Sequence, residues 1–385
     1  MANKGTGIFK YLRGDKGIWT IMMILTFVSI AAVYSSTGRL AYLKQGGDTT
    51  YYMLKHLGIL VVAWGIMYGV HRVRYTYFSR FAQLMVLPVL ALLMITLTMA
   101  TVNDAARWIK LGPLSFQPSE LAKLVIVVFL ARQLTKYQPV IKEGRTLLRL
   151  LWVPLLGAAL IFPENLSTAA LLLLTCFVMM IVGGVASRYI WSMLGAGVLF
   201  VALFLSVLYF VPAENLPGRF STWKARVERF GSEEDESYQV TQSKIAIAGG
   251  GVFGKGPGNS TQRNFLPHPY SDYIYSLIIE EYGMFAGIGV MLLYLWFLMR
   301  GISIARRCRG SFGSYMVLGI TFMLTLQALI NMGVAVDLLP VTGQPLPFLS
   351  MGGTSLFFTA CGMGVILSVS ADVEKTELEE NKREK

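Results

Sequence analysis

Long apolar runs recur along this 385-residue chain, and they constrain its fold more than any other feature. A helix needs about 20 mostly apolar residues to cross a bilayer. Only 15% of the residues are charged, whereas a soluble protein carries roughly 25%. The sequence therefore predicts an all-α, polytopic integral membrane protein. We predict ten transmembrane helices, at roughly 18–36, 53–70, 82–102, 119–134, 149–162, 167–185, 190–211, 272–299, 313–336 and 351–370.

Basic residues gather in alternate connections between the predicted spans, for example in 72–80, 132–149 and 300–309. The positive-inside rule places such connections in the cytoplasm. Because the span count is even, we expect both termini to be cytoplasmic. The segment 212–271, between spans seven and eight, is then a large extracytoplasmic loop.

We expect a single membrane domain, residues 1–371, followed by a charged cytoplasmic tail, 372–385, that is solvated and mobile. The basic N-terminus leads into an apolar run too long for a signal peptide, so this run is expected to stay as the first span. The formal net charge of +12 lies mainly in the cytoplasmic connections. We therefore assign it to membrane topology and expect no nucleic-acid partner.

The three cysteines, Cys176, Cys308 and Cys361, show no pairing or ligand spacing. We predict neither a disulfide nor a metal site from them.

A glycine-rich segment, GGGVFGKGPGN at 249–259, precedes the eighth predicted span. It imitates nucleotide-binding motifs, but Gly256 follows Lys255 where a P-loop needs Ser or Thr, and no strand precedes the glycines. Two interpretations remain open. The backbone N–H groups bind a phosphate with Lys255 as counter-charge, or the segment is a flexible turn.

One carboxylate, Asp272, lies where this polar loop re-enters the membrane. Acidic groups at such a place are costly and are usually functional. Asp272 either complements the dipole of the helix that follows or acts as a general base. Because Asp is a weak base at neutral pH, the second interpretation needs surroundings that make it more basic.

Two adjacent carboxylates, Glu280 and Glu281, lie about 12 Å deeper along the same predicted helix. They cannot both face lipid cheaply, so at least one should face the interior with a cationic partner. Lys123 is the candidate, although it could instead pair with Glu120 at i, i+3. For Glu120, Glu280 and Glu281 we expect a structural or electrostatic role.

Several polar residues of the outer segments suggest an outward-facing cavity. Arg107 is a candidate for holding a phosphate at its rim, and its neighbour Trp108 has the position of an interfacial anchor. Arg226 lies in KARVERF, a predicted amphipathic helix on the outer surface. Its side chain is either solvated or placed against lipid headgroups.

Together, four segments make the chain similar to the SEDS family of peptidoglycan polymerases, exemplified by FtsW and RodA. The resemblance covers nearly all ten predicted spans in order. Members of this family use lipid II, an undecaprenyl-diphosphate-linked disaccharide peptide, on the outer face of the bacterial cytoplasmic (inner) membrane. The four segments are RWIKLGPLSFQPSELAKL, YQVTQSKIAIAGGGVFGKGPGNSTQ, FLPHPYSDYIYSLIIEEYG and LPVTGQPLPFLSMGGTS.

The resemblance implies an inverting peptidoglycan glycosyltransferase with Asp272 as its general base. Asp272 would take the proton from the acceptor hydroxyl as that oxygen attacks the anomeric carbon of the growing chain. Undecaprenyl diphosphate would then leave, stabilised by cationic side chains or by a divalent cation, Mg or Mn. The candidate substrate-binding residues are Arg107, Trp108, Lys123, Arg226, Gln242, Ser243 and Lys255.

The resemblance also implies a class B penicillin-binding protein, which is a transpeptidase, and other division proteins as partners. The forms PHPYSD and VTGQPLPFLSMGG resemble FtsW of Bacteroidetes. They favour a role in division over one in elongation, which uses the same chemistry.

The chain departs from the family pattern at three places. His268 stands where many members have Glu, and Thr342 stands where a Lys is common. The motif P-D-x-G-T reads PENLST, with Glu164 and Ser167. His268 and Thr342 give no support to a second acid or base at those two positions.

Two further functions were weighed against the polymerase. A flippase that moves lipid II across the membrane would need alternating access, and the sequence shows no inverted repeat or paired broken helices. A scaffold without catalysis would have no need of Asp272.

Overall fold

The computed structural model describes residues 13–384 except 39, 41, 43–48, 101–108, 112–113, 213, 215, 217–219, 231–237 and 268. In this part of the chain, each of the ten predicted spans corresponds to one long helix. These helices are α1 (Lys16–Ser36), α3 (Thr49–Arg72), α4 (Thr76–Ala100), α5 (Pro118–Lys136), α6 (Gly144–Ile161), α7 (Leu166–Val182), α8 (Ser187–Phe210), α11 (Ile274–Arg307), α12 (Ser311–Ala335) and α13 (Gly353–Arg383).

Eight of these helices, all except α5 and α7, are long and apolar enough to cross a membrane. Helix α7 is equally apolar but has only 17 residues. Helix α5 is less apolar because it carries Glu120 and Lys123. The chain is a polytopic, almost entirely helical membrane protein.

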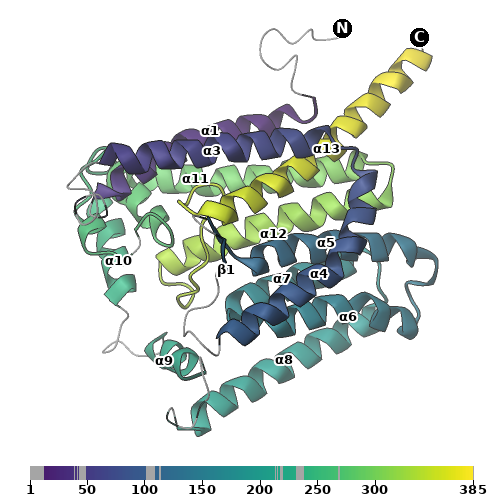
Figure 1. Cartoon of the computed structure of the whole chain (residues 1–385), viewed down its shortest axis with the longest axis horizontal. Coiled ribbons are helices and arrows are strands. Elements are labelled where there is room, and N and C mark those ends of the chain that lie inside the picture. Colours follow the sequence, from purple (N-terminus) through teal and green to yellow (C-terminus); the bar gives the residue numbers. More distant parts are fainter. Residues whose placement is uncertain are drawn as a thin grey trace.

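The long helices lie side by side in one bundle (Figure 1). Helix α5 is central: it packs against α4, α6, α7 and α12, while α13 packs along α3. Helix α8 lies at the margin of the bundle, and only Leu208 of its described side chains is buried. Such an apolar helix is stable only where lipid or another protein covers it.

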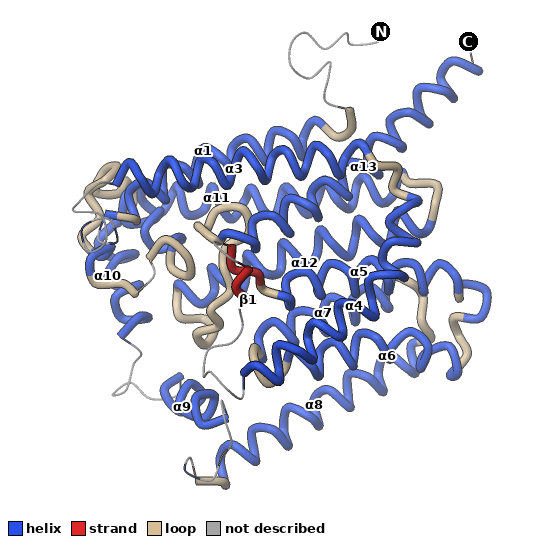
Figure 2. The backbone as a smooth tube through the Cα atoms, viewed as in Figure 1, coloured by secondary structure: helices blue, strands red, loops and turns tan. Residues whose placement is uncertain are grey.

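The all-α prediction missed one short element. Strands β1 (Ile109–Leu111) and β2 (Leu114–Phe116) pair as an antiparallel hairpin just before α5, drawn in red in Figure 2. The Phe116 ring contacts Phe358 of α13 edge to face, at 5.5 Å between centroids. A short hairpin cannot be recognised from apolar periodicity over so few residues.

The start of α1 and the final part of α13 lie together. The backbone N–H of Asp15 donates to Ser370 Oγ at 2.5 Å, and that of Gly14 donates to Glu374 Oε2 at 2.9 Å. The charged tail was expected to be mobile, but up to Arg383 it continues α13 as a helix. Ion pairs that join α13 to the end of α11 and the residues after it, such as Arg307–Glu377 at 3.5 Å, support this extension.

The segment 212–271 contains two helices, α9 (Phe220–Phe230) and α10 (Tyr238–Gly250), and a 3₁₀ turn at Gln262–Asn264. Helix α9 confirms the helix predicted around Arg226. An aromatic cluster joins α9 to α8 and to the end of α6. Its members are Phe162, Phe200, Phe204, Phe220 and Trp223.

Candidate active site

Asp272 lies two residues before the first residue of α11, and its side chain is partly exposed. Its Oδ1 accepts a hydrogen bond from Ser271 Oγ at 2.8 Å. Helix α11 has no side-chain cap, and no acidic residue lies in its first turn. The alternative of a helix-capping Asp therefore finds no support, and the carboxylate is left for another role.

The backbone around Asp272 is held by the loop between α12 and α13. Asn331 of α12 donates from Nδ2 to the carbonyl oxygens of Asp272 and Gln344, both at 2.8 Å. A side-chain carbon at Gly343 would lie 3.9 Å from Asp272 Oδ2, and Gly343 has φ +65°. The loop therefore comes close to the carboxylate without covering it, in a conformation that suits glycine.

A second set of bonds fixes the residues just before Asp272. Ser350 Oγ donates to the carbonyl of Ser271 at 2.5 Å and accepts from the N–H of Leu346 at 2.8 Å. The N–H of Met351 donates to the carbonyl of Tyr270 at 2.9 Å. Burial raises the pKa of the Tyr270 hydroxyl, and the nearby Tyr52 and Asp272 raise it further. Tyr270 therefore stays neutral.

Replacing Asn331 by Leu should lower the catalytic rate about 10- to 100-fold, because a misplacement of about 1 Å at a reacting group has that cost. Substrate binding should change much less, since Asn331 holds backbone and not substrate. Steady-state rates at varied substrate concentration measure both quantities. Asn259→Leu is the matched control, because Asn259 is exposed and donates one bond, to Lys255 O at 3.0 Å. Equal losses in the two variants would contradict the role of Asn331.

Lys123 is buried and pairs with Glu120 at 2.8 Å. Its Nζ also donates to Gln327 Oε1 at 2.8 Å, and Gln327 Nε2 donates to Pro345 O at 3.0 Å. The structural i, i+3 pair is therefore present. The predicted substrate contact of Lys123 finds no support, because the residue is 1% exposed and its ammonium is already bonded. From α5, Lys123 thus supports the loop beside Asp272 through Gln327 and Pro345.

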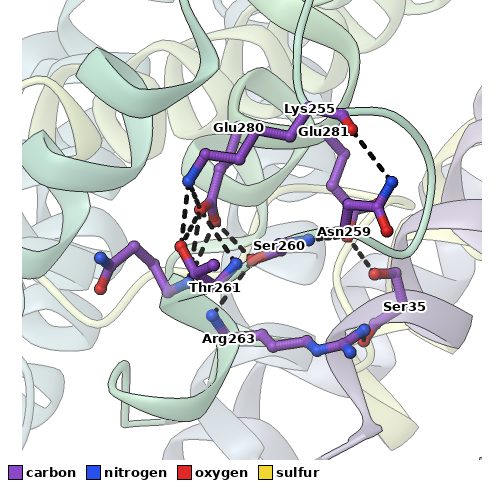
Figure 3. Close-up of polar contacts among 9 residues, drawn as sticks. Ser35, Lys255, Asn259, Ser260, Thr261, Arg263, Glu280 and Glu281 are labelled. Carbon is purple, nitrogen blue, oxygen red and sulfur yellow. Dashed lines mark hydrogen bonds and ion pairs between the residues drawn. The ribbon is translucent and has the colours of Figure 1, made fainter.

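The prediction that Lys123 pairs with Glu280 or Glu281 is wrong. Both glutamates are buried as expected, but Glu280 pairs with Lys255 at 2.7 Å (Figure 3). The Glu280 carboxylate also accepts from Thr261 N at 3.1 Å, Thr261 Oγ1 at 2.9 Å and the hydroxyl of Ser260.

Glu281 makes a parallel set of contacts. Its carboxylate accepts from the hydroxyl of Ser35, on α1, and from Ser260 N at 3.3 Å. The two glutamates thus fasten the loop 251–264 and the end of α1 to α11, and the structural role predicted for them fits these contacts.

The glycine-rich segment is fixed against α11. The N–H groups of Lys255 and Gly256 donate to the carbonyls of Glu280 and Glu281, both at 2.9 Å. Gly283, with φ +80°, kinks α11, and a side chain there would come within 2.1 Å of Val252 O. The N–H groups of Lys255 and Gly256 and the Lys255 ammonium are therefore engaged within the chain. These contacts give no support to a phosphate loop, and the two interpretations of the segment stay predictions.

The remaining substrate-binding candidates are placed differently from one another. Ser243 is fully buried and bonds Ser276 Oγ at 2.5 Å and Ala335 O at 2.6 Å, so its predicted substrate contact is not supported. Gln242, its neighbour on α10, is partly exposed. Arg226 donates to Val341 O at 3.0 Å, two residues from Gly343, so it is bonded to the α12–α13 loop that borders Asp272.

Three predicted residues, Arg107, Trp108 and His268, lie outside the described residues. The sequence reasoning missed Asn331 and Gln327, which lie one turn apart on α12 and are buried. The sequence contains a signal for both residues, because amide side chains inside an apolar span are costly and are usually functional.

The fold is that of a polytopic helical membrane protein, and its candidate site is a partly exposed carboxylate just before one long apolar helix. A family model for FtsW, RodA and SpoVE, described as "Cell cycle protein", matches residues 15–375. The chain belongs to this family.

Two curated relatives illustrate the likeness. The "Probable peptidoglycan glycosyltransferase FtsW" of Coxiella burnetii is 31% identical over 371 residues, covering 92% of this chain and 96% of the relative. The "Stage V sporulation protein E" of Bacillus subtilis is 33% identical over 362 residues, covering 91% and 95%.

Solved structures share the fold. The rod shape determining protein RodA of Thermus thermophilus superposes with a TM-score of 0.66 at 23% identity, covering 94% of this chain and 98% of RodA. A chain from work on polymerization and crosslinking by a peptidoglycan synthase complex superposes with a TM-score of 0.72 at 24% identity, with the same coverage.

Proposed function

We propose that this chain is a peptidoglycan glycosyltransferase that polymerises lipid II during septal cell-wall synthesis, with Asp272 as general base. One observation carries the proposal: in a member of this family, Asp272 is partly exposed while its own backbone is clamped by Asn331. Among the described residues, no cation pairs with this carboxylate. A carboxylate whose backbone is held in place is suited to accept a proton.

In this mechanism Asp272 takes the proton of the acceptor hydroxyl as that oxygen attacks the anomeric carbon of the growing glycan. The bond to undecaprenyl diphosphate breaks, and the configuration at the anomeric carbon inverts. The diphosphate leaves with its own negative charge, so a cation aids its departure. Arg226 is the candidate for this role, because it is bonded to the loop that borders Asp272.

A divalent cation is a second source of positive charge. No cluster of three His, Cys, Asp or Glu side chains occurs in the described part of the chain. A Mg²⁺ or Mn²⁺ ion would therefore be held chiefly by the diphosphate of the substrate, in the way Mg²⁺ usually binds phosphates with one or two carboxylates.

For the topology we propose ten spans, with both termini in the cytoplasm and residues 212–271 outside. The contact between Asp15 and Ser370 supports the placement of both ends of the domain 1–371 on the same side of the membrane. The basic connections support the cytoplasm as that side. Asp272, at the opposite end of α11 from Arg307, then faces the exterior, where lipid II is used.

A class B penicillin-binding protein is the proposed partner, together with other division proteins. The support is the similar chain of a peptidoglycan synthase complex. The curated relatives named FtsW favour division over elongation. The Bacteroidetes-like motifs point the same way.

The proposal is tested with the purified chain in liposomes that contain labelled lipid II, with and without the transpeptidase partner. We expect glycan polymer to form, and more of it with the partner, while lipid II does not cross the bilayer. Transbilayer movement without polymer, even with the partner present, would overturn the polymerase in favour of the flippase.

A further inference from the structure

A small pocket opens at the basic end of the bundle, where α5 packs against α4 and α12. Its volume is about 210 Å³, and it lies far along α5 from the Asp272 site. Ser79 belongs to the first turns of α4, and Phe312 is the second residue of α12. The lining residues are Ser79, Arg132, Thr135, Lys136 and Phe312.

Two cations of this pocket lack a counter-ion. Arg132 Nη1 donates to Ser79 Oγ at 2.5 Å, and Lys136 Nζ lies 5.2 Å from the centre of the Tyr137 ring. Neither pairs with a carboxylate among the residues described. The printed partners of these two side chains, a hydroxyl and an aromatic ring, are neutral, so the pocket favours an anion.

The hydroxyl groups refine the chemistry of that anion. Ser79 Oγ accepts from Arg132, so its own hydrogen remains to be donated. Thr135 Oγ1 already donates to Ala131 O at 3.0 Å, so towards a ligand it only accepts. The pocket therefore offers donors for a phosphate and one acceptor for a hydroxyl group next to it.

The helix ends around the pocket act in opposite senses. The N-termini of α4 and α12 favour an anion, while the C-terminus of α5 opposes it. Lys136 in the last turn of α5 compensates that end. The balance is set by the two side-chain cations.

We propose that this pocket binds the phosphodiester headgroup of an anionic phospholipid, with phosphatidylglycerol as the matching chemistry. Basic pockets between membrane helices at the cytoplasmic level are suited to such headgroups. Arg132 and Lys136 hold the phosphate, Ser79 donates to it, and Thr135 accepts from the glycerol hydroxyl. Because α5 packs against α4 and α12, the bound lipid ties these three helices together.

The test uses the full chain, with native mass spectrometry of lipid adducts in phosphatidylglycerol and phosphatidylcholine. The variant Arg132→Gln/Lys136→Gln is compared with Lys142→Gln/Arg145→Gln, which removes one Lys and one Arg that are exposed at the same end. Both variants lose the general surface attraction. The pocket variant should lose about tenfold more phosphatidylglycerol affinity, the worth of a hydrogen bond to a charged group. Equal losses in both variants would overturn the proposal.

Two further arms identify the ligand. Inorganic phosphate at constant ionic strength should not compete with the lipid; if it displaces phosphatidylglycerol and stabilises the chain alone, the ligand is a soluble phosphate and the lipid assignment fails. Thr135→Val keeps both cations and tests the site should the double variant fail to fold. It should weaken phosphatidylglycerol about threefold and leave phosphatidic acid, which lacks the glycerol hydroxyl, unchanged. An equal change for both lipids contradicts the pocket geometry.

Discussion

Asp272→Asn should leave a folded protein that binds lipid II but polymerises it about 10²- to 10⁴-fold more slowly. A general base contributes roughly 10²–10⁴-fold to a rate, and the amide cannot accept the proton of the acceptor hydroxyl. The change keeps the size of the side chain. The Asn331 bond to the backbone carbonyl of residue 272 does not involve the replaced group. Rates on lipid II, measured beside lipid II binding and thermal midpoint, separate catalysis from folding.

Asp337→Asn is the matched control for this variant. Asp337 follows α12 at the same end of the bundle, and its carboxylate pairs with Lys244 at 3.3 Å. Its removal should change the rate less than about twofold, since partly exposed pairs contribute little. Full activity of Asp272→Asn, or equal losses in the two variants, would contradict the general-base role.

Glu280→Ala should lower the free energy of unfolding by about 3 kcal/mol, the largest stability effect we expect. The carboxylate is fully buried and accepts several hydrogen bonds from the loop 251–264. Each buried donor left without an acceptor costs about 1–3 kcal/mol. Lys255, whose side chain is 31% exposed, would turn to solvent, so its charge adds little. The thermal midpoint in detergent measures the effect.

Glu377→Ala gives the comparison for an exposed carboxylate. Glu377 pairs with Arg307 at 3.5 Å, and both side chains are more than 40% exposed. Such a pair is worth about 0–1 kcal/mol, so the midpoint should hardly move. If Glu280→Ala is as mild as Glu377→Ala, the glutamate cluster does not hold the loop to α11.

The helices could be predicted because long apolar runs are visible in the sequence, and the bilayer imposes the length of a span. The ends of the helices depend on tertiary contacts, so the observed bounds differ from the predicted ones. Helix α11 runs to Arg307, eight residues beyond the predicted end at 299, and α13 runs to Arg383. The exposed ion pair Arg307–Glu377 joins the two extensions, whose polar sequence made hydropathy alone end both helices sooner.

Within the site, Asp272 could be selected as a candidate because a lone carboxylate at a membrane entry is conspicuous, while its role as general base came from the family resemblance and stays a prediction. The contacts that hold its backbone could not be predicted, because they join distant parts of the chain. Asn331 is 59 residues from Asp272, and Lys123 is 204 residues from Gln327. The partner of Glu280 was missed for the same reason. Lys123 pairs with Glu120, the alternative that the sequence left open, and Lys255 reaches Glu280 from a loop whose path cannot be predicted from depth along a helix.

The central claim is that this chain joins lipid II units, and product stoichiometry tests it most directly. Purified protein with its transpeptidase partner is given labelled lipid II, and the released undecaprenyl diphosphate is counted against the glycosidic bonds formed. The account predicts one diphosphate per bond, with inverted configuration at the anomeric carbon. Diphosphate release without glycan bonds, or retained configuration, would contradict it.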